Sequence, residues 1–172
     1  MRPLLFTFLL ALGLATSAWA RLGETPEQMQ ERLGPPTSQR GTADVNANGK
    51  VYNYGQSLHY AKDGWSLGCI FVNGVCVKIT YNKNAAFTDD DLRTILKNEA
   101  QGAQWTQSVS YTTLVDSVIL PTMKVREWKR ADGAQAQIIG NSLVVVTPEF
   151  QKAVDGANAK AKADAEKKMP DL

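Results

Sequence analysis

Two cysteines, Cys69 and Cys76, are the residues of this chain whose type points most directly to covalent chemistry. Their separation of seven positions differs from the Cys-x-x-Cys spacing of dithiol redox sites. An Asn-Gly turn at 73–74 would place them diagonally across a β-hairpin. Diagonal Cα atoms are about 7–8 Å apart, whereas a disulfide needs roughly 4.4–6.8 Å. A shifted register or a bulge would bring them together, and an oxidising compartment favours the bond. We expect a disulfide; two buried thiols, or metal or redox chemistry, are the alternatives.

The single histidine and the carboxylates form no recognised catalytic motif. His59 would need a nucleophile or further metal ligands, and no Gly-x-Ser-x-Gly, His-Glu-x-x-His or phosphate-loop pattern occurs. Glu24, Glu27 and Glu31 could supply paired glycosidase carboxylates, but a solvated helix face explains them more simply. The three aspartates at 89–91 lack the ligand spacing of a calcium loop. We therefore predict no catalytic residue, no metal site and no cofactor, and a protein that is not an enzyme.

Aromatic side chains concentrate in one predicted sheet. Exposed aromatic clusters often mark contacts with proteins or sugars, and core packing is the alternative explanation. The residues that we predict to bind a partner are Tyr52, Tyr54, Tyr60, Trp65 and Phe71.

Composition limits the class of protein. The chain has 172 residues, 44% hydrophobic and 21% charged, which is ordinary for one globular domain or two small ones. Nineteen basic and 17 acidic residues give a net charge of +2, which excludes a dedicated nucleic-acid binder. One histidine and two cysteines exclude a histidine-rich metal cage and a cysteine-stapled scaffold.

Residues 1–20 have the pattern of a secretory signal peptide. Arg2 precedes an apolar run over 4–15, and an Ala-Trp-Ala sequence ends at Ala20, after which we expect cleavage. The 12 apolar residues fall short of the roughly 20 that span a bilayer; an uncleaved anchor is the alternative. We predict a periplasmic or secreted protein whose mature chain has no transmembrane segment.

Residues 21–83 predict one helix followed by an antiparallel sheet. Thr25 has the spacing of a capping box, Pro26 suits the first helical position, and Gly34 ends the helix. Residues 37–50 are rich in Gly, Asn, Ser and Thr and predict a loop. Turns at 63–64 (Asp-Gly) and 73–74 (Asn-Gly) delimit strands at 56–62, 65–72 and 75–81, with 51–54 as a further candidate strand. Both faces of this sheet are apolar, so either both are covered or a bulge switches the core face.

Residues 84–147 have a similar layout, with poor residue identity to the first unit. Thr88 caps a helix that Gly102 is expected to end, and strands are expected at 105–120, 124–130, 134–139 and 143–147. Residues 148–172 are rich in Ala and Lys and predict a helical tail. The predicted fold class is α+β, with helices packed on an antiparallel β-meander. Two tandem helix-plus-sheet units are one arrangement that this order allows.

The stretch Gly-Glu-Thr-Pro-Glu-Gln-Met-Gln-Glu-Arg-Leu-Gly-Pro-Pro, residues 23–36, resembles the opening of the SmpA/OmlA (BamE-like) family. Residues 71–79 resemble that family's strand–turn–strand. The resemblance covers 23–81 and implies short helices packed on antiparallel sheet, and protein binding. The family's lipid-bearing cysteine is missing, and 87–147 have no counterpart in its short members. The layout is also similar to the β-lactamase-inhibitor-protein-like fold.

These observations together predict an exported, non-enzymatic protein-binding module of the bacterial cell envelope. Its expected partner is another envelope or secreted protein. One alternative is an enzyme or small-ligand binder with a cleft between the two halves. Another is a structural envelope component whose Ala/Lys tail lies along a second surface.

Overall fold

A computed structural model describes residues 20–47, 50–110 and 125–167. Thr25 and Thr88 are the N-caps of the first two helices, and each side-chain oxygen accepts a hydrogen bond from the backbone N–H of the third helical residue, Gln28 or Asp91. In return, the side chain of that third residue accepts a hydrogen bond from the backbone N–H of the threonine. These reciprocal bonds satisfy backbone donors that a helix start leaves free. The predicted starts of the first two helices are therefore confirmed. The helices of the described residues are α1 (Pro26–Leu33), α2 (Asp89–Asn98) and α3 (Pro148–Glu166).

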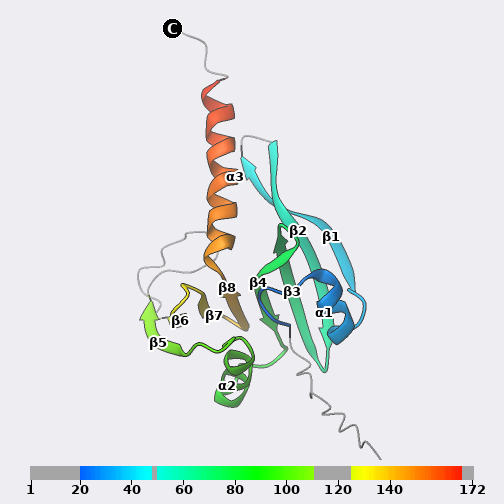
Figure 1. The fold of residues 1–172 in the computed structure, drawn as a ribbon, viewed down its shortest axis with the longest axis vertical. Helices are drawn as coiled ribbons and strands as arrows, with labels where there is room; N and C mark the ends of the chain where they lie inside the picture. Colours follow the sequence, from blue (N-terminus) through cyan, green and yellow to red (C-terminus); the bar gives the residue numbers. More distant parts are fainter. Residues whose placement is uncertain (1–19, 48–49, 111–124, 168–172) are drawn as a thin grey trace, which may run out of the picture.

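Eight strands within the described ranges form one antiparallel sheet in the order β1-β2-β3-β4-β8-β7-β6-β5 (Figure 1). Both Asp63-Gly64 and Asn73-Gly74 adopt positive φ at both positions, as tight hairpin turns require, so these predicted turns are confirmed. The strands are β1 (Ser38–Ala47), β2 (Lys50–Lys62), β3 (Trp65–Val72), β4 (Val75–Asn82), β5 (Trp105–Ser110), β6 (Val125–Arg130), β7 (Gln135–Ile139) and β8 (Ser142–Val146).

The ladder between β4 and β8 joins the first four strands to the last four. It runs from Lys78 opposite Val146 to Asn82 opposite Ser142. Each half of the chain thus supplies one helix and then four strands, and the halves meet in the middle of a continuous sheet. The predicted α+β class, with helices packed on antiparallel sheet, is confirmed.

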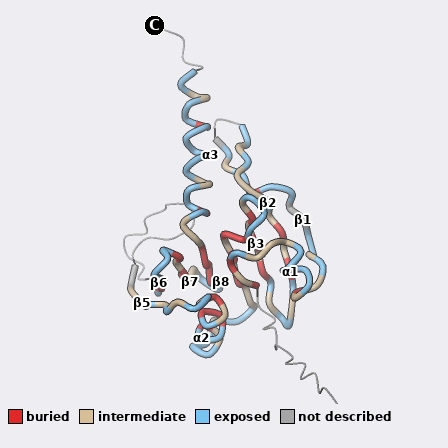
Figure 2. The backbone as a smooth tube through the Cα atoms, in the orientation of Figure 1, coloured by how far each residue is buried: buried red, intermediate tan, exposed pale blue. Residues whose placement is uncertain are grey.

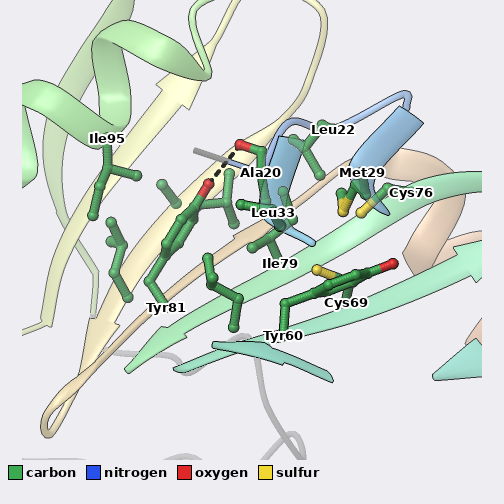
Figure 3. Close-up of a cluster of buried hydrophobic side chains, with 14 of the residues drawn as sticks. Ala20, Leu22, Met29, Leu33, Tyr60, Cys69, Cys76, Ile79, Tyr81 and Ile95 are labelled. Atoms are coloured by element: carbon green, nitrogen blue, oxygen red, sulfur yellow. Dashed lines mark hydrogen bonds between the residues drawn. The ribbon is translucent and has the colours of Figure 1, made fainter. Parts of the chain in front are cut away.

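The larger hydrophobic core lies between the sheet and helices α1 and α2. Figure 2 shows buried residues along the central strands, whereas most of α3 is exposed. Alternation along a strand sends every second side chain to this face. Its fully buried members include Met29 of α1, Ile95 of α2, and Leu67, Ile79 and Leu143 of the sheet (Figure 3 labels Met29, Ile95 and Ile79).

A smaller apolar cluster lies on the opposite face, where α3 begins. Val77, Val144, Val146 and Phe150 are its buried members. The pairing of β3 with β4 shifts after Ile70, and Val77 is the extra residue of the resulting bulge. The bulge returns Ile79 and the residues after it to the face of the larger core. Both arrangements left open by the sequence are therefore present: a covered second face and a bulge.

Two predicted boundaries are wrong. Residues 38–47, predicted as loop, form the edge strand β1, which pairs only with β2 and shifts register between Arg40 and Asp44. An edge strand tolerates the polar residues that suggested a loop. Helix α2 ends at Asn98 with Glu99 as its C-cap, a few residues before the predicted end at Gly102. Positive φ angles at Gln101 (49°) and Gly102 (85°) then turn the chain away from the helix.

The predicted segments 1–19, 111–120 and 168–172 lie outside the described residues. Within the part of the chain that the structure describes, no helix combines the length and apolar character needed to cross a membrane.

We predict opposite effects for two glycine-to-alanine changes. At Gly55, in β2, a Cβ atom would lie 2.6 Å from the backbone oxygen of Phe71, so Gly55→Ala should lower the free energy of unfolding by about 1–3 kcal/mol. At Gly156, in α3, nothing lies within 4 Å, and Gly156→Ala should raise it by about 1 kcal/mol through helix propensity. Denaturant titration of both variants beside the parent chain measures this. An equal effect at both positions would contradict the packing described for β2.

Candidate functional site

Cys69 and Cys76 are buried free thiols on the face of the larger core, so the expected disulfide is not formed in the structure. Cys69 pairs with Ile79 and Cys76 pairs with Phe71, so the cysteines are not directly opposite each other. Figure 3 shows both among Met29 and the ring of Tyr60. Burial, followed by a hydrogen bond with Cys69, raises the pKa of Cys76 well above its ordinary value. The second possibility from the sequence, two buried thiols, is the arrangement present.

Glu24 and the three aspartates at 89–91 form ion pairs with lysine or arginine, and His59 is not among the partners that the structure describes for them. His59 lies on the sheet face away from α1 and α2, and it pairs with Gly68 of β3. The imidazole ring covers this glycine: a Cβ atom added to Gly68 would lie 3.4 Å from the ring. Glu24 forms an ion pair with Arg32, and the Asp91 carboxylate accepts the Thr88 N–H at the start of α2 and forms an ion pair with Lys83. Among the described residues no cluster of three His, Cys, Asp or Glu side chains could hold a metal ion.

The five predicted partner-binding aromatics do not form one surface. Tyr60 and Phe71 are each 1% exposed and belong to the core beneath α1, so they cannot contact a partner in the folded chain. Trp65 packs on Phe87, with ring centroids 5.5 Å apart, and Lys83 lies over both rings. Tyr52, Tyr54 and Tyr60 all occupy even positions of β2, so regular alternation would place them on one face. The register of β2 against β1 shifts near Gly55, between Tyr54 and Tyr60, and this irregularity separates Tyr60 from the other two tyrosines.

The remaining two aromatics, Tyr52 and Tyr54, hold helix α3. The Tyr54 ring meets Phe150 edge-on, with centroids 6.1 Å apart. Farther along α3, Asp164 accepts hydrogen bonds from the Tyr52 hydroxyl at 3.1 Å and from Lys50 at 3.2 Å. These contacts fix α3 beside the β1–β2 hairpin, as Figure 1 shows. The role of these two tyrosines in the structure is therefore within the chain.

A groove of about 550 Å³ lies between α2 and strands β5 and β6; we call it the tryptophan groove. Its apolar floor includes Trp105 and Trp128, and its polar members are mostly cationic. Arg126 lies over the Trp128 ring at 5.3 Å and forms an exposed ion pair with Asp89. Exposed ion pairs are weak, so a partner's carboxylate can compete for the arginine. The lining residues are Asp89, Leu92, Arg93, Leu96, Lys97, Ala100, Ala103, Gln104, Trp105, Arg126 and Trp128.

A second groove, of about 570 Å³, lies between α3 and strands β2 and β3; we call it the α3 groove. Its lining mixes polar side chains with glycines and apolar residues, with Lys152 and Lys160 as its charged residues and Tyr54 as a half-buried aromatic. Neither groove includes His59, and Asp89 is the single carboxylate that lines either of them. Neither lies between the two halves, because the β4–β8 ladder joins them directly.

A buried polar cluster centres on Glu99, which has no exposed surface. Its carboxylate accepts a hydrogen bond from the Leu22 N–H at 3.0 Å and lies 2.6 Å from the Tyr81 hydroxyl. The Arg130 guanidinium donates to the Glu99 backbone carbonyl and to Asp132. Burial raises the pKa of Glu99 to about 7, against the hydrogen bonds and the charge of Arg130, which lower it. The same burial raises the pKa of Tyr81.

The sequence interpretation missed both the tryptophan groove and the Glu99 cluster. One signal for the groove was available: Arg126, Trp128 and Arg130 alternate in a predicted strand and must share a face. The second tryptophan joins them only through the pairing of Trp105 with Arg130. Glu99 carried no such signal, because a glutamate near a helix end is usually exposed.

Comparisons with protein-family models, with curated proteins and with solved structures gave no match to this chain.

Both thiols should resist alkylation in the folded protein and react after unfolding. Burial of Cys69 and Cys76, and the raised pKa of Cys76, leave little exposed thiolate at pH 8. The measurement is mass spectrometry after iodoacetamide treatment without reductant, in buffer and in guanidinium. Two added groups in guanidinium confirm free thiols. No addition until a reductant is present would show the disulfide instead.

Glu99 should make stability fall as pH rises in the chain that retains Ala20. Its folded pKa of about 7 exceeds the ordinary 4.5, so the folded state holds a proton that the unfolded state releases between these values. The free energy of unfolding should therefore drop by about 3 kcal/mol from pH 4.5 to pH 7 and level off above. Glu99→Gln should remove this drop. Denaturant titrations across pH 4–8 measure the difference, and parallel profiles for the two chains would refute it.

Proposed function

We propose that this chain is an exported, non-enzymatic module of the bacterial cell envelope that binds another protein. The tryptophan groove is the observation that supports binding best. Tryptophan and arginine are the side chains most enriched at interface hot spots. Here Trp105, Trp128 and Arg126 gather in a groove whose volume falls within the usual range of binding clefts.

The charges around the groove favour an acidic partner. Arg93, Lys97 and Arg126 line it against the one carboxylate, Asp89. A segment that places a large apolar side chain on the tryptophans and carboxylates beside the cations complements both features. We infer that the partner is an envelope or secreted protein with such a segment.

Export and family resemblance rest on the N-terminal part of the sequence. Residues 1–20 have the composition and order of a signal peptide, and cleavage after Ala20 would deliver the chain to the periplasm or the medium. Residues 23–81 resemble the SmpA/OmlA (BamE-like) family. The capped helix α1 followed by antiparallel hairpins is consistent with that resemblance.

We also infer that residues 21–83 and 84–147 are tandem units, followed by the helical tail 148–172. Each unit has a Thr-capped helix followed by four antiparallel strands. From one edge of the sheet the strands run β1 to β4 in chain order, and from the other edge they run β5 to β8 in chain order, so the two sets meet at the β4–β8 ladder. Two similar four-stranded units joined through their last strands would give this order. The layout is similar to the β-lactamase-inhibitor-protein-like fold.

Charge reversal in the tryptophan groove should weaken partner binding without unfolding the protein. Arg93→Glu with Lys97→Glu changes two exposed positions of α2, and should reduce affinity at least tenfold by placing like charge opposite an acidic segment. The partner is first identified by cross-linking residues 21–172 in an envelope extract. Its purified form is then titrated against each variant by calorimetry.

The matched control is Lys152→Glu with Lys160→Glu, which reverses two exposed lysines of the α3 groove. This pair should leave affinity within twofold. Equal weakening by both pairs would show a general charge effect. Weakening by the control alone would move the binding surface to the α3 groove.

A further inference from the structure

The backbone of residues 20–23 is built into the core beside Glu99. Ala20 has no exposed surface, and its carbonyl oxygen lies 3.0 Å from the Tyr81 hydroxyl, as Figure 3 shows. The Leu22 N–H donates to the Glu99 carboxylate at 3.0 Å, and the Gly23 N–H donates to the Cys76 carbonyl at 2.8 Å. Hydrogen bonds thus hold this segment at Ala20, Leu22 and Gly23.

The Tyr81 hydroxyl has two acceptors and one hydrogen. It lies 2.6 Å from Glu99 and 3.0 Å from the Ala20 carbonyl. When Glu99 is protonated, it donates to Tyr81 and Tyr81 donates to Ala20, so each group is satisfied. When Glu99 is ionised, Tyr81 donates to the carboxylate and the Ala20 carbonyl loses its donor. With Ala20 in place, the site therefore suits a neutral carboxyl group.

We propose that Glu99 and Tyr81 form the binding site for the α-ammonium group that cleavage after Ala20 creates on Arg21. The inference rests on the proposed export, whose peptidase supplies the cleavage. Water adds across the Ala20–Arg21 bond, the new carboxylate departs with Ala20, and the amine of Arg21 takes up a proton. In the uncleaved chain the Arg21 nitrogen lies about 2.3 Å from the Ala20 carbonyl oxygen, as peptide bond lengths require. After cleavage, a rotation of the freed chain end brings the amine to the place beside Tyr81 that this oxygen leaves.

The new ammonium supplies the countercharge for the buried carboxylate. It lies one residue from the Leu22 N–H that Glu99 already holds. The charged or titratable groups that interact with this cluster include Tyr81 of β4, Arg130 of β6, Arg32 of α1, the Arg21 side chain and the two cysteines. An added positive charge lowers the pKa of the carboxyl group and keeps it ionised, and the Tyr81 hydrogen then belongs to Glu99 alone. Removal of residues 1–20 thus raises the free energy of unfolding through a buried ion pair between the Arg21 ammonium group and Glu99.

The test compares two purified chains at pH 7. One begins at Arg21 with a free amine, and the other retains Ala20 behind a Gly-Ser leader. Each is made with Glu99 and with Glu99→Gln. In the Glu99 chains, removing the leader and Ala20 should raise the folded-to-unfolded ratio at least tenfold. In the Glu99→Gln chains, the same removal should change the ratio less than twofold.

A second measurement reads the amine directly. The α-amine of Arg21 should react with an amine-acylating reagent at pH 8 at least ten times more slowly in the parent chain than in Glu99→Gln, measured on the N-terminal peptide. Tyr81→Phe, which keeps the ring, should also accelerate labelling. Thr94→Ala, an exposed change in α2, whose C-cap is Glu99, should leave the labelling rate unchanged. Equal labelling rates, or equal effects of the leader in both backgrounds, would overturn the inference.

N-terminal sequencing of the protein recovered from a bacterial envelope fraction separates the two proposals. A first residue other than Arg21 overturns both the cleavage site and this inference. A first residue of Arg21 with a freely labelled amine overturns this inference and leaves export intact.

Discussion

The pairing of β4 with β8 is the interaction on which the rest of the structure depends. It makes one sheet of two four-stranded meanders, and it buries strands that would otherwise be exposed edges. The larger core is continuous across it, since Ile79 and Tyr81 of β4 lie beside Leu143 and Val145 of β8. Thr147, the N-cap of α3, donates its N–H to the Val77 carbonyl, so the start of the third helix is fixed to the same ladder.

Local chemistry made much of this fold predictable from the sequence. Capping threonines at 25 and 88 and turn residues at 63–64 and 73–74 act through bonds within a few positions, and the structure has them as expected. Strand β1 was not recognised, because a polar edge strand and a loop have similar composition. The bulge at Val77 is one of two alternatives that the sequence leaves open, because apolar residues on both faces of a strand fit either a bulge or a sheet covered on both sides.

The candidate site was less predictable, because it depends on strand pairing and register between residues that are far apart in the sequence. Tyr52, Tyr54 and Tyr60 lie at even positions of one strand, yet Tyr60 is in the core while Tyr52 and Tyr54 contact α3, because the β1–β2 register shifts near Gly55 between them. Residues far apart in sequence, such as Trp105 and Trp128, were brought together by long-range pairing of β5 with β6. The sheet therefore uses one face to bury Glu99 and the other to hold a helix, and neither arrangement is local in the sequence.

The attachment of α3 has a mechanical consequence. The helix is fixed near its start through Phe150 against Tyr54, and again through Asp164 against the β1–β2 hairpin. These two points are 14 residues apart, or about 21 Å of helix. The helix is thus anchored at its start to the central strands and near its end to the β1–β2 hairpin at the edge of the sheet. Exposed polar groups make the contact at the far end, whereas a buried apolar cluster makes the contact at the start, so the far end is the weaker of the two attachments.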